Sequence, residues 1–257
     1  ACFAQADPVG ASRRFCQAYS HICYPKGADA ALISDISASI INDVFPTDAE
    51  LQQVLDNPVV KLNLVVAKAR RISAARHKVL QAAALSLAAS ANLIHRKHLQ
   101  YFFQRVLFHL PGAPSPFHHA GILPTQHVAL TAANLRQAVL ASGSIPMVLN
   151  PVENIAGAGA GLYYDGGITD YHFDLPFSSD GLVLYPHFYP RLTPGWFDKS
   201  LPWRRTKQAH LHNVVLLCPS EQWVKSLPFG KIPDRNDFKL PDNVRINYWQ
   251  EVIARSE

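Results

Sequence analysis

The sequence predicts an α/β protein in which helices cover both faces of a central sheet. Segments with helical periodicity alternate with short apolar runs that favour strands. One of these runs, 59–68, is apolar at nearly every position after Asn63, as expected of a strand that is buried on both faces. With 257 residues, 48% hydrophobic and 17% charged, the chain can bury a sizeable core in one domain. We therefore expect a three-layer α/β/α architecture.

Three helices are predicted before this first strand, over 9–24, 28–45 and 47–55. The third begins with Thr47 as N-cap and Glu50 three residues later, which is the spacing of a capping box. After the strand, a long helix is predicted over 73–99. Its apolar residues recur at intervals of three and four: Leu80, Ala84, Leu87, Ala91 and Ile94.

The middle of the chain predicts a strand over 101–110 and a helix over 131–139. Thr131 is the expected N-cap of that helix, and Gly143 with Pro146 stops it. Further along, the short apolar runs 181–185 and 213–218 predict two buried strands. Helices are expected again over 220–227 and 243–256. The part from 219 to 257 is therefore expected to be a C-terminal helical extension.

Two proline-rich segments, 111–124 and 186–203, are predicted to be irregular. The second contains Trp196 and Trp203 among other aromatic residues, close to several arginines and lysines. Two interpretations are open. The aromatic side chains suit a surface that rests on a lipid interface, and they equally suit a packed connection at the edge of the core.

The most informative segment is LYYDGGITDYHFDLP, in which Asp165 precedes Gly166 and Gly167 at the end of a predicted strand. Two interpretations fit these residues. Asp-Gly between strand-like residues is typical of a tight hairpin turn. An aspartate before two glycines can also be held against a reacting group, because its neighbours carry no side chains that block approach.

The order of two motifs favours the second interpretation. The run NLRQAVLASGSIPMVLNPV ends a predicted helix and is followed about twenty residues later by the segment that contains Asp165. Together they resemble the distal half of the patatin-like phospholipase family, which are serine acyl hydrolases. The resemblance implies a three-layer α/β/α fold and the hydrolysis of lipid esters without a cofactor or a metal.

The resemblance also implies roles for individual residues. It makes Asp165 the catalytic aspartate of a Ser-Asp dyad, with Gly166 and Gly167 adjacent to the site. The family's nucleophile lies in a G-x-S-x-G elbow that precedes these motifs, and no such sequence occurs in the 257 residues. The sequence begins at Ala1 and enters a predicted helix with no strand before it. We therefore expect residues 1–257 to be an acyl hydrolase domain that lacks its N-terminal strand, oxyanion loop and nucleophile, and to be inactive alone.

Other residues compete for the site. Asp170, Asp174 and Asp180 lie close to Asp165 in sequence but lack the double glycine, and Tyr171 and His172 are candidates to line the same region. Twelve histidines lack the spacing of a known zinc motif, so no metal is expected. The glycine run 157–161 precedes a strand, which favours a turn beside the site over a nucleotide loop.

Charge and cysteine content give weaker expectations. A formal charge of +5 favours peripheral contact with an anionic membrane, and nothing indicates nucleic acid. The four cysteines are interpreted as small buried residues or free thiols of a reducing compartment, so a cytoplasmic location is expected. The alternative to an esterase is a non-catalytic module that binds lipid or a protein partner. A dinucleotide-dependent enzyme, suggested only by the glycine run, is a third interpretation.

Overall fold

The computed structural model describes residues 1–75, 77–112, 115–117, 121–177 and 180–256. The chain forms a mixed α/β fold around a five-stranded sheet with the order β3-β2-β1-β5-β4. Pairing along the sheet is antiparallel except between β2 and β3, which are parallel. The strands are β1 (Asn63–Ala69), β2 (Phe103–His109), β3 (Thr125–Ala129), β4 (Val152–Glu153) and β5 (Leu162–Asp165).

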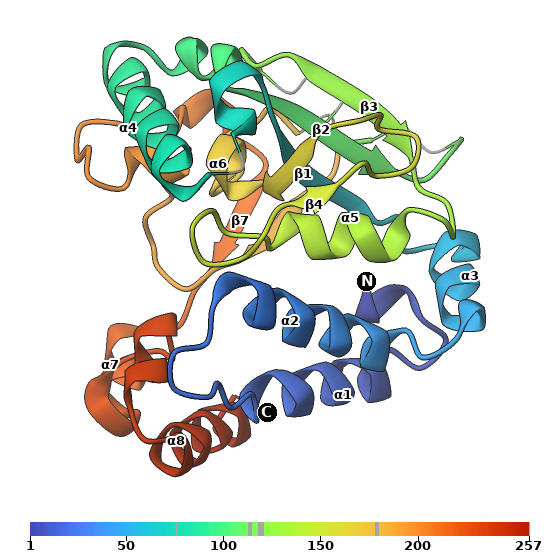
Figure 1. Ribbon diagram of the computed structural model, residues 1–257. Helices are drawn as coiled ribbons and strands as arrows, with labels where there is room; N and C mark the ends of the chain where they lie inside the picture. Colours follow the sequence, from blue (N-terminus) through green and yellow to red (C-terminus); the bar gives the residue numbers. More distant parts are fainter. Residues whose placement is uncertain (76, 113–114, 118–120, 178–179, 257) are drawn as a thin grey trace.

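Core side chains lie on both faces of the sheet because alternate residues of each strand point to opposite sides. In β1, Val66 belongs to one core cluster and Ala67 to the other. The first cluster packs against α5 (Leu135–Ser142), and the second packs against α4 (Lys78–Ile94). Figure 1 shows these two helices on opposite sides of the strands. Burial of β1 on both faces, predicted from its continuous apolar run, is confirmed.

The first three helices, predicted from periodicity, are confirmed as α1 (Pro8–Ser20), α2 (Ala30–Val44) and α3 (Asp48–Asp56). The capping box of α3 is formed: the Ala49 N–H donates to Thr47 Oγ1 (3.1 Å), and the Thr47 N–H donates to Glu50 Oε2 (3.0 Å). In Figure 1, α1 and α2 lie side by side below α5.

The long helix predicted over 73–99 is shorter than expected. α4 spans Lys78–Ile94, with a 3-10 helix on either side at Arg71–Ala74 and Arg96–Tyr101. The prediction of Thr131 as N-cap of α5 is wrong, because the helix begins after Asn134 and the Thr131 N–H instead donates to Asn134 Oδ1 (2.9 Å).

The C-terminal part contains a separate two-stranded parallel sheet of β6 (Val183–Pro186) and β7 (Val214–Leu217), followed by α7 (Glu221–Ser226) and α8 (Asp242–Ala254). The two strands were expected to be buried, and this is wrong: Leu184 is 62% exposed and Leu217 is 58% exposed. Alternate side chains of so small a sheet have nothing to pack against. Leu227 on the chain after α7 packs with Tyr248, Trp249 and Val252 of α8.

In the part of the chain that the structure describes, no disulfide joins the four cysteines, which agrees with their interpretation as thiols. Cys16 and Cys23 are exposed, so the alternative interpretation, small buried residues, is wrong for these two. Among the described residues, no helix has the length and apolar character needed to cross a membrane.

Candidate active site

The two motifs that carry the family resemblance touch each other. The N–H of Asp165, at the end of β5, donates to the carbonyl of Ser144, just beyond the end of α5, at 2.9 Å. Ser144 is fully buried, and its hydroxyl donates to the Leu140 carbonyl at 2.9 Å. The residues that follow, Ile145 and Pro146, line the same cavity as Asp165. Folding therefore brings the ASGSIP turn and the D-G-G sequence into one site.

The segment after Asp165 does not form a hairpin, so that interpretation of Asp-Gly-Gly is wrong. The chain passes from β5 directly into the short helix α6 (Gly167–Asp170). Gly166 crosses the neighbouring strand so closely that a Cβ atom there would lie 2.2 Å from the Val65 carbonyl oxygen. The Gly167 N–H donates to Asp165 Oδ1 at 2.7 Å and holds the carboxylate in place.

Asp165 lines a cavity of about 460 Å³. Its walls come from distant parts of the sequence and are mostly apolar or aromatic. They include Tyr19, Ile145, Pro146, Ile168, Tyr171, Phe188, Tyr189, Trp196, Lys199, Ile232, Pro233, Asp234 and Arg235. A carboxylate in such surroundings loses hydration that the apolar walls do not replace.

The charge of Asp165 is governed by this burial. Burial raises the pKa of the carboxyl group, while the hydrogen bond from the Gly167 N–H and the positive charge of Lys199 act in the opposite direction. The Lys199 ammonium lies 3.8 Å from the centre of the Tyr171 ring in a cation–π contact, and Lys199 lines the same cavity as Asp165. A carboxylate with a raised pKa is a stronger base than an aspartate in water.

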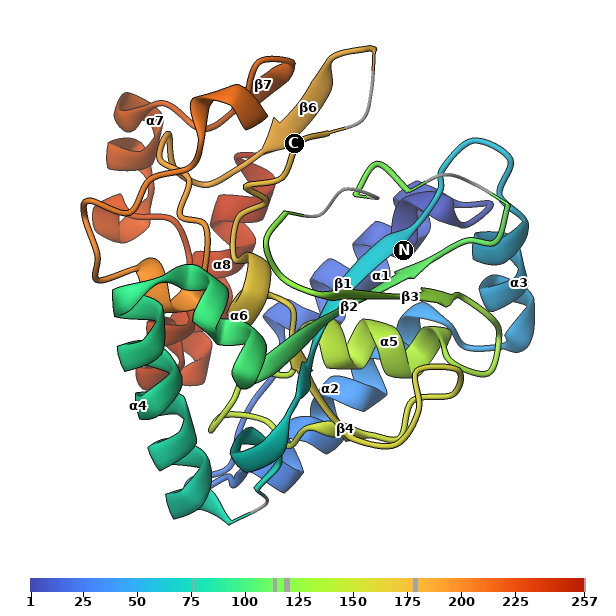
Figure 2. The ribbon, with the colours of Figure 1, turned by 90° about the horizontal axis from the view of Figure 1, so that it is seen from above.

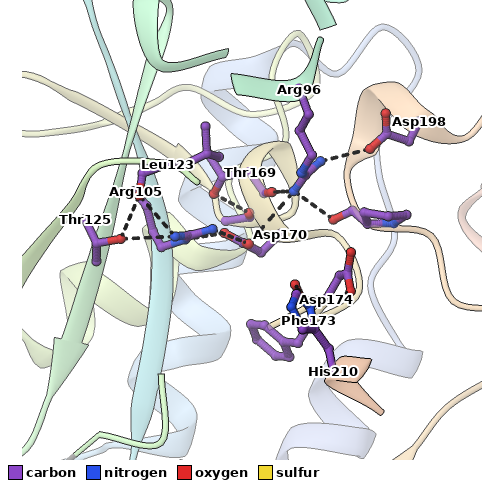
Figure 3. A network of polar contacts seen from close by, with 12 residues as sticks. Arg96, Arg105, Leu123, Thr125, Thr169, Asp170, Phe173, Asp174, Asp198 and His210 are labelled. Atoms are coloured by element: carbon purple, nitrogen blue, oxygen red, sulfur yellow. Dashed lines mark hydrogen bonds and ion pairs between the residues drawn. The ribbon is translucent and has the colours of Figure 1, made fainter. Parts of the chain in front are cut away.

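The other three candidate aspartates, Asp170, Asp174 and Asp180, do not line this cavity. Both oxygens of Asp170 accept from Arg105, whose Nε and Nη2 each lie 2.6 Å away, and both side chains are 2% exposed (Figure 3). Asp174 Oδ1 lies 3.0 Å from the Nδ1 of His210. Asp180 is exposed. Of the four aspartates weighed from the sequence, only Asp165 lines the cavity.

A second buried network fixes one wall of the cavity, and sequence reasoning missed it. Asp198 is fully buried and accepts from Asn92 of α4 (2.7 Å) and from Arg96 (2.9 Å). Arg96 also donates to the carbonyls of Thr169 and Pro194 (Figure 3). These bonds attach the segment that carries Trp196 and Lys199 to α4. For the other buried pair the sequence did hold a signal: Arg105 lies in the mostly apolar run 101–110, which indicates a buried ion pair, but the sequence does not identify Asp170 as its partner.

Tyr171 and His172 have different places. Tyr171 lines the cavity, as expected, whereas His172 is not among its lining residues. His172 Nδ1 accepts the Thr193 N–H at 2.7 Å, and the ring lies 4.1 Å from that of His187, centre to centre. Burial, with smaller contributions from His187 and Lys199, lowers the pKa of His172 to about 4.

A second and larger cavity, of about 800 Å³, adjoins the first. It lies between the end of the β6–β7 sheet and the C-terminal helices, and its lining includes Leu217, Trp223 and Val252. Phe188, Ile232 and Pro233 line both cavities. These three residues therefore separate the cavity that Asp165 lines from the larger, mostly apolar cavity.

The remaining candidates lie away from the cavity. The glycine run 157–161 joins β4 to β5 and does not line the cavity, so its expected place beside the site is wrong. Lys68 Nζ donates to the Ala158 carbonyl in this turn at 3.0 Å.

The two tryptophans of the segment 186–203 lie in different surroundings. Trp196 lines the cavity, whereas Trp203 is 65% exposed.

Within the described residues, no group of three or more His, Cys, Asp or Glu side chains is placed to hold a metal ion. The pair His118 and His119 lies outside the described residues.

Comparison of the chain with family models, with curated proteins and with solved structures gave no match.

Proposed function

We propose that this chain is the base-bearing part of a serine acyl hydrolase of the patatin-like type, which cleaves lipid esters. One observation carries the proposal: the Asp165 carboxylate faces an apolar cavity and is attached through its own backbone to the turn at Ser144. The helices on both faces of the sheet support the three-layer patatin-like fold that belongs to this proposal.

The chemistry requires a serine from outside this sequence, since the 257 residues hold no G-x-S-x-G elbow. Its Oγ attacks the ester carbonyl while Asp165 accepts the hydroxyl proton and delivers it to the leaving alcohol. Water then attacks the acyl-enzyme and Asp165 accepts a proton from this water. The bond between the serine Oγ and the acyl carbon breaks, the carboxylic acid leaves, and Asp165 returns the proton to the serine Oγ. The raised pKa of Asp165 lies closer to the pKa of the serine hydroxyl. The smaller difference between the two pKa values favours both proton transfers.

The surroundings of Asp165 favour a lipid ester as substrate. The aromatic walls and the adjoining cavity of about 800 Å³ suit an acyl chain, because burial of each methylene contributes about 0.8 kcal/mol. Lys199 and Arg235 are exposed residues of the smaller cavity, and their charges suit the phosphate of a phospholipid headgroup.

The alternative is a module that binds lipid without turning it over, and the size of the second cavity favours it as well. The two functions differ in what Asp165 does. In a binding module, Asp165→Asn leaves the affinity for a fatty-acid analogue unchanged and no activity exists to be lost.

Labelling with a fluorophosphonate probe tests the proposal. This chain alone should remain unlabelled because it contains no nucleophile. A polypeptide in which the chain follows its own G-x-S-x-G elbow should be labelled at that serine, and Asp165→Asn should slow the labelling at least tenfold. Stoichiometric labelling of the chain alone, or equal labelling rates with and without the carboxylate, would contradict the proposal.

A further inference from the structure

The chain has an unusual distribution of charge. No Asp or Glu occurs between Asp56 and Glu153, although ten lysines and arginines do. The rest of the chain, which contains all 19 acidic residues, is net negative. The helix α4 lies within this stretch without carboxylates, and Figures 1 and 2 both place it at the periphery of the molecule.

The outward side of α4 is apolar. Its exposed residues, with their exposed fractions, are Val79 (68%), Leu80 (59%), Leu87 (54%), Leu93 (52%) and Ile94 (78%). At 100° per residue these positions fall on one side of the helix, whereas Ala84, Ala88 and Asn92 on the opposite side are buried. Single exposed leucines are ordinary on a protein surface, but a helix that shows a whole apolar face to solvent is not.

The polar groups on this face are already satisfied. The hydroxyl of Ser86 donates to the Ala82 carbonyl at 3.0 Å, and the hydroxyl of Ser90 donates to the Ser86 carbonyl at 3.1 Å. Neither needs water as an acceptor. The whole face can therefore leave water without the cost of an unpaired donor.

Cations flank the face at both ends. Arg71 and Lys78 lie at the first end and Lys97 lies just beyond the last, and all three are exposed. At the last end, Arg204 Nη2 donates to the Asn92 carbonyl at 2.8 Å. This bond attaches the segment that contains the exposed Trp203 to the end of α4. An apolar face with basic ends and an adjacent tryptophan matches the composition of helices that lie in a membrane interface.

We propose that α4 docks on an anionic lipid surface, with its outward face among the acyl chains and its flanking cations at the headgroups. Charge complementarity favours lipid over a protein partner, because attraction to anionic lipid contributes about 1 kcal/mol per Lys or Arg near the surface. The surface is independent of Asp165, so it would serve the binding module as well as the proposed hydrolase.

Co-sedimentation of the chain with vesicles tests this surface. The wild-type chain should bind vesicles of phosphatidylcholine with phosphatidylserine at least tenfold more tightly than vesicles of phosphatidylcholine alone. The double variant Leu87→Glu and Ile94→Glu should lose at least tenfold in partitioning, since it places carboxylates on the docking face. The control is the double variant Val59→Glu and Leu182→Glu, at two apolar positions outside α4 that are at least as exposed as Leu87 and Ile94. It should bind as the wild type does.

Three outcomes would overturn the docking surface: no binding by the wild type, equal binding to the two kinds of vesicle, or unchanged binding by the α4 variant. A wild-type dimer that the α4 variant makes monomeric, without vesicle binding, would assign the face to a second copy of the chain instead. Asp165→Asn should bind vesicles normally, so a failed hydrolase proposal leaves this result unaffected.

Discussion

The backbone N–H of Asp165 donates to the carbonyl of Ser144 at 2.9 Å, which joins the end of β5 to the turn after α5. This one bond fixes the aspartate relative to Ile145 and Pro146, which form part of the cavity wall. Asp165 also pairs with Val66 in the central strand, so its position is set by the sheet and by α5 together. A carboxylate placed in this way is held on rigid elements, as a catalytic base must be.

The first prediction concerns the stability of the fold as a function of pH. Burial raises the pKa of Asp165, so the folded state holds this proton more tightly than the unfolded chain does. The free energy of unfolding therefore falls as the pH rises from the unfolded pKa through the folded one. Asp165→Asn removes that loss and should be more stable than the wild type at pH 7, by about 1.4 kcal/mol for each unit of pKa increase.

Urea unfolding of both proteins at several pH values measures this difference. The stabilising effect of the variant should disappear near pH 3, where the aspartate is protonated in both states. The asparagine oxygen can still accept the Gly167 N–H, so the backbone should keep its conformation. A variant that is less stable than the wild type at pH 7 would show that the carboxylate is not strained by its burial.

The second prediction concerns the ion pair between Arg105 and Asp170, which is almost completely buried. Asp170→Asn leaves the guanidinium without its charged partner and should lower the free energy of unfolding by about 3–5 kcal/mol. The control is Asp48→Asn, which removes the partner of Arg136 in a pair whose aspartate is 87% exposed. That change should cost less than about 1 kcal/mol. Equal costs for the two variants would contradict the difference in burial.

The third prediction concerns His172. Burial lowers its pKa to about 4, and its Nδ1 accepts the Thr193 N–H, so the imidazole is neutral at physiological pH. The unfolded chain takes up this proton near pH 6.5, so this histidine's contribution to stability is complete above that pH. The contribution is lost as the pH falls from 6.5 to about 4. NMR titration of the imidazole should show no protonation above about pH 5; a midpoint near 6.5 would contradict the neutral, buried ring.

Much of the fold follows from local sequence. The capping box at Thr47 and Glu50, the helical periodicities and the continuous apolar run of β1 each predict an element that forms. The strands β3 and β4 were missed for a physical reason. β3 contains Gln126 and His127, and β4 has only two residues, so neither has an apolar pattern.

The candidate site could be predicted only in part. Asp165 is the candidate base from sequence because D-G-G and ASGSIP are local motifs whose order is visible in the sequence. The rest of the cavity could not be predicted, since Lys199, Ile232 and Pro233 approach Asp165 only through the tertiary fold. The pairing of Arg105 with Asp170 likewise arises only through the tertiary fold. A charged residue in a buried strand implies a partner of opposite charge, but the sequence spacing does not identify that partner.

The most direct test measures ester hydrolysis by a polypeptide in which a segment with a G-x-S-x-G elbow precedes this chain, with a short-chain nitrophenyl ester as substrate. Asp165→Asn should lower kcat by at least a hundredfold, because general-base catalysis contributes on the order of 10²–10⁴ in rate. Asp180→Asn, at an exposed aspartate nearby, should retain wild-type kcat. Near-normal turnover by Asp165→Asn, with the fold intact by circular dichroism, would contradict the assignment of Asp165 as the base.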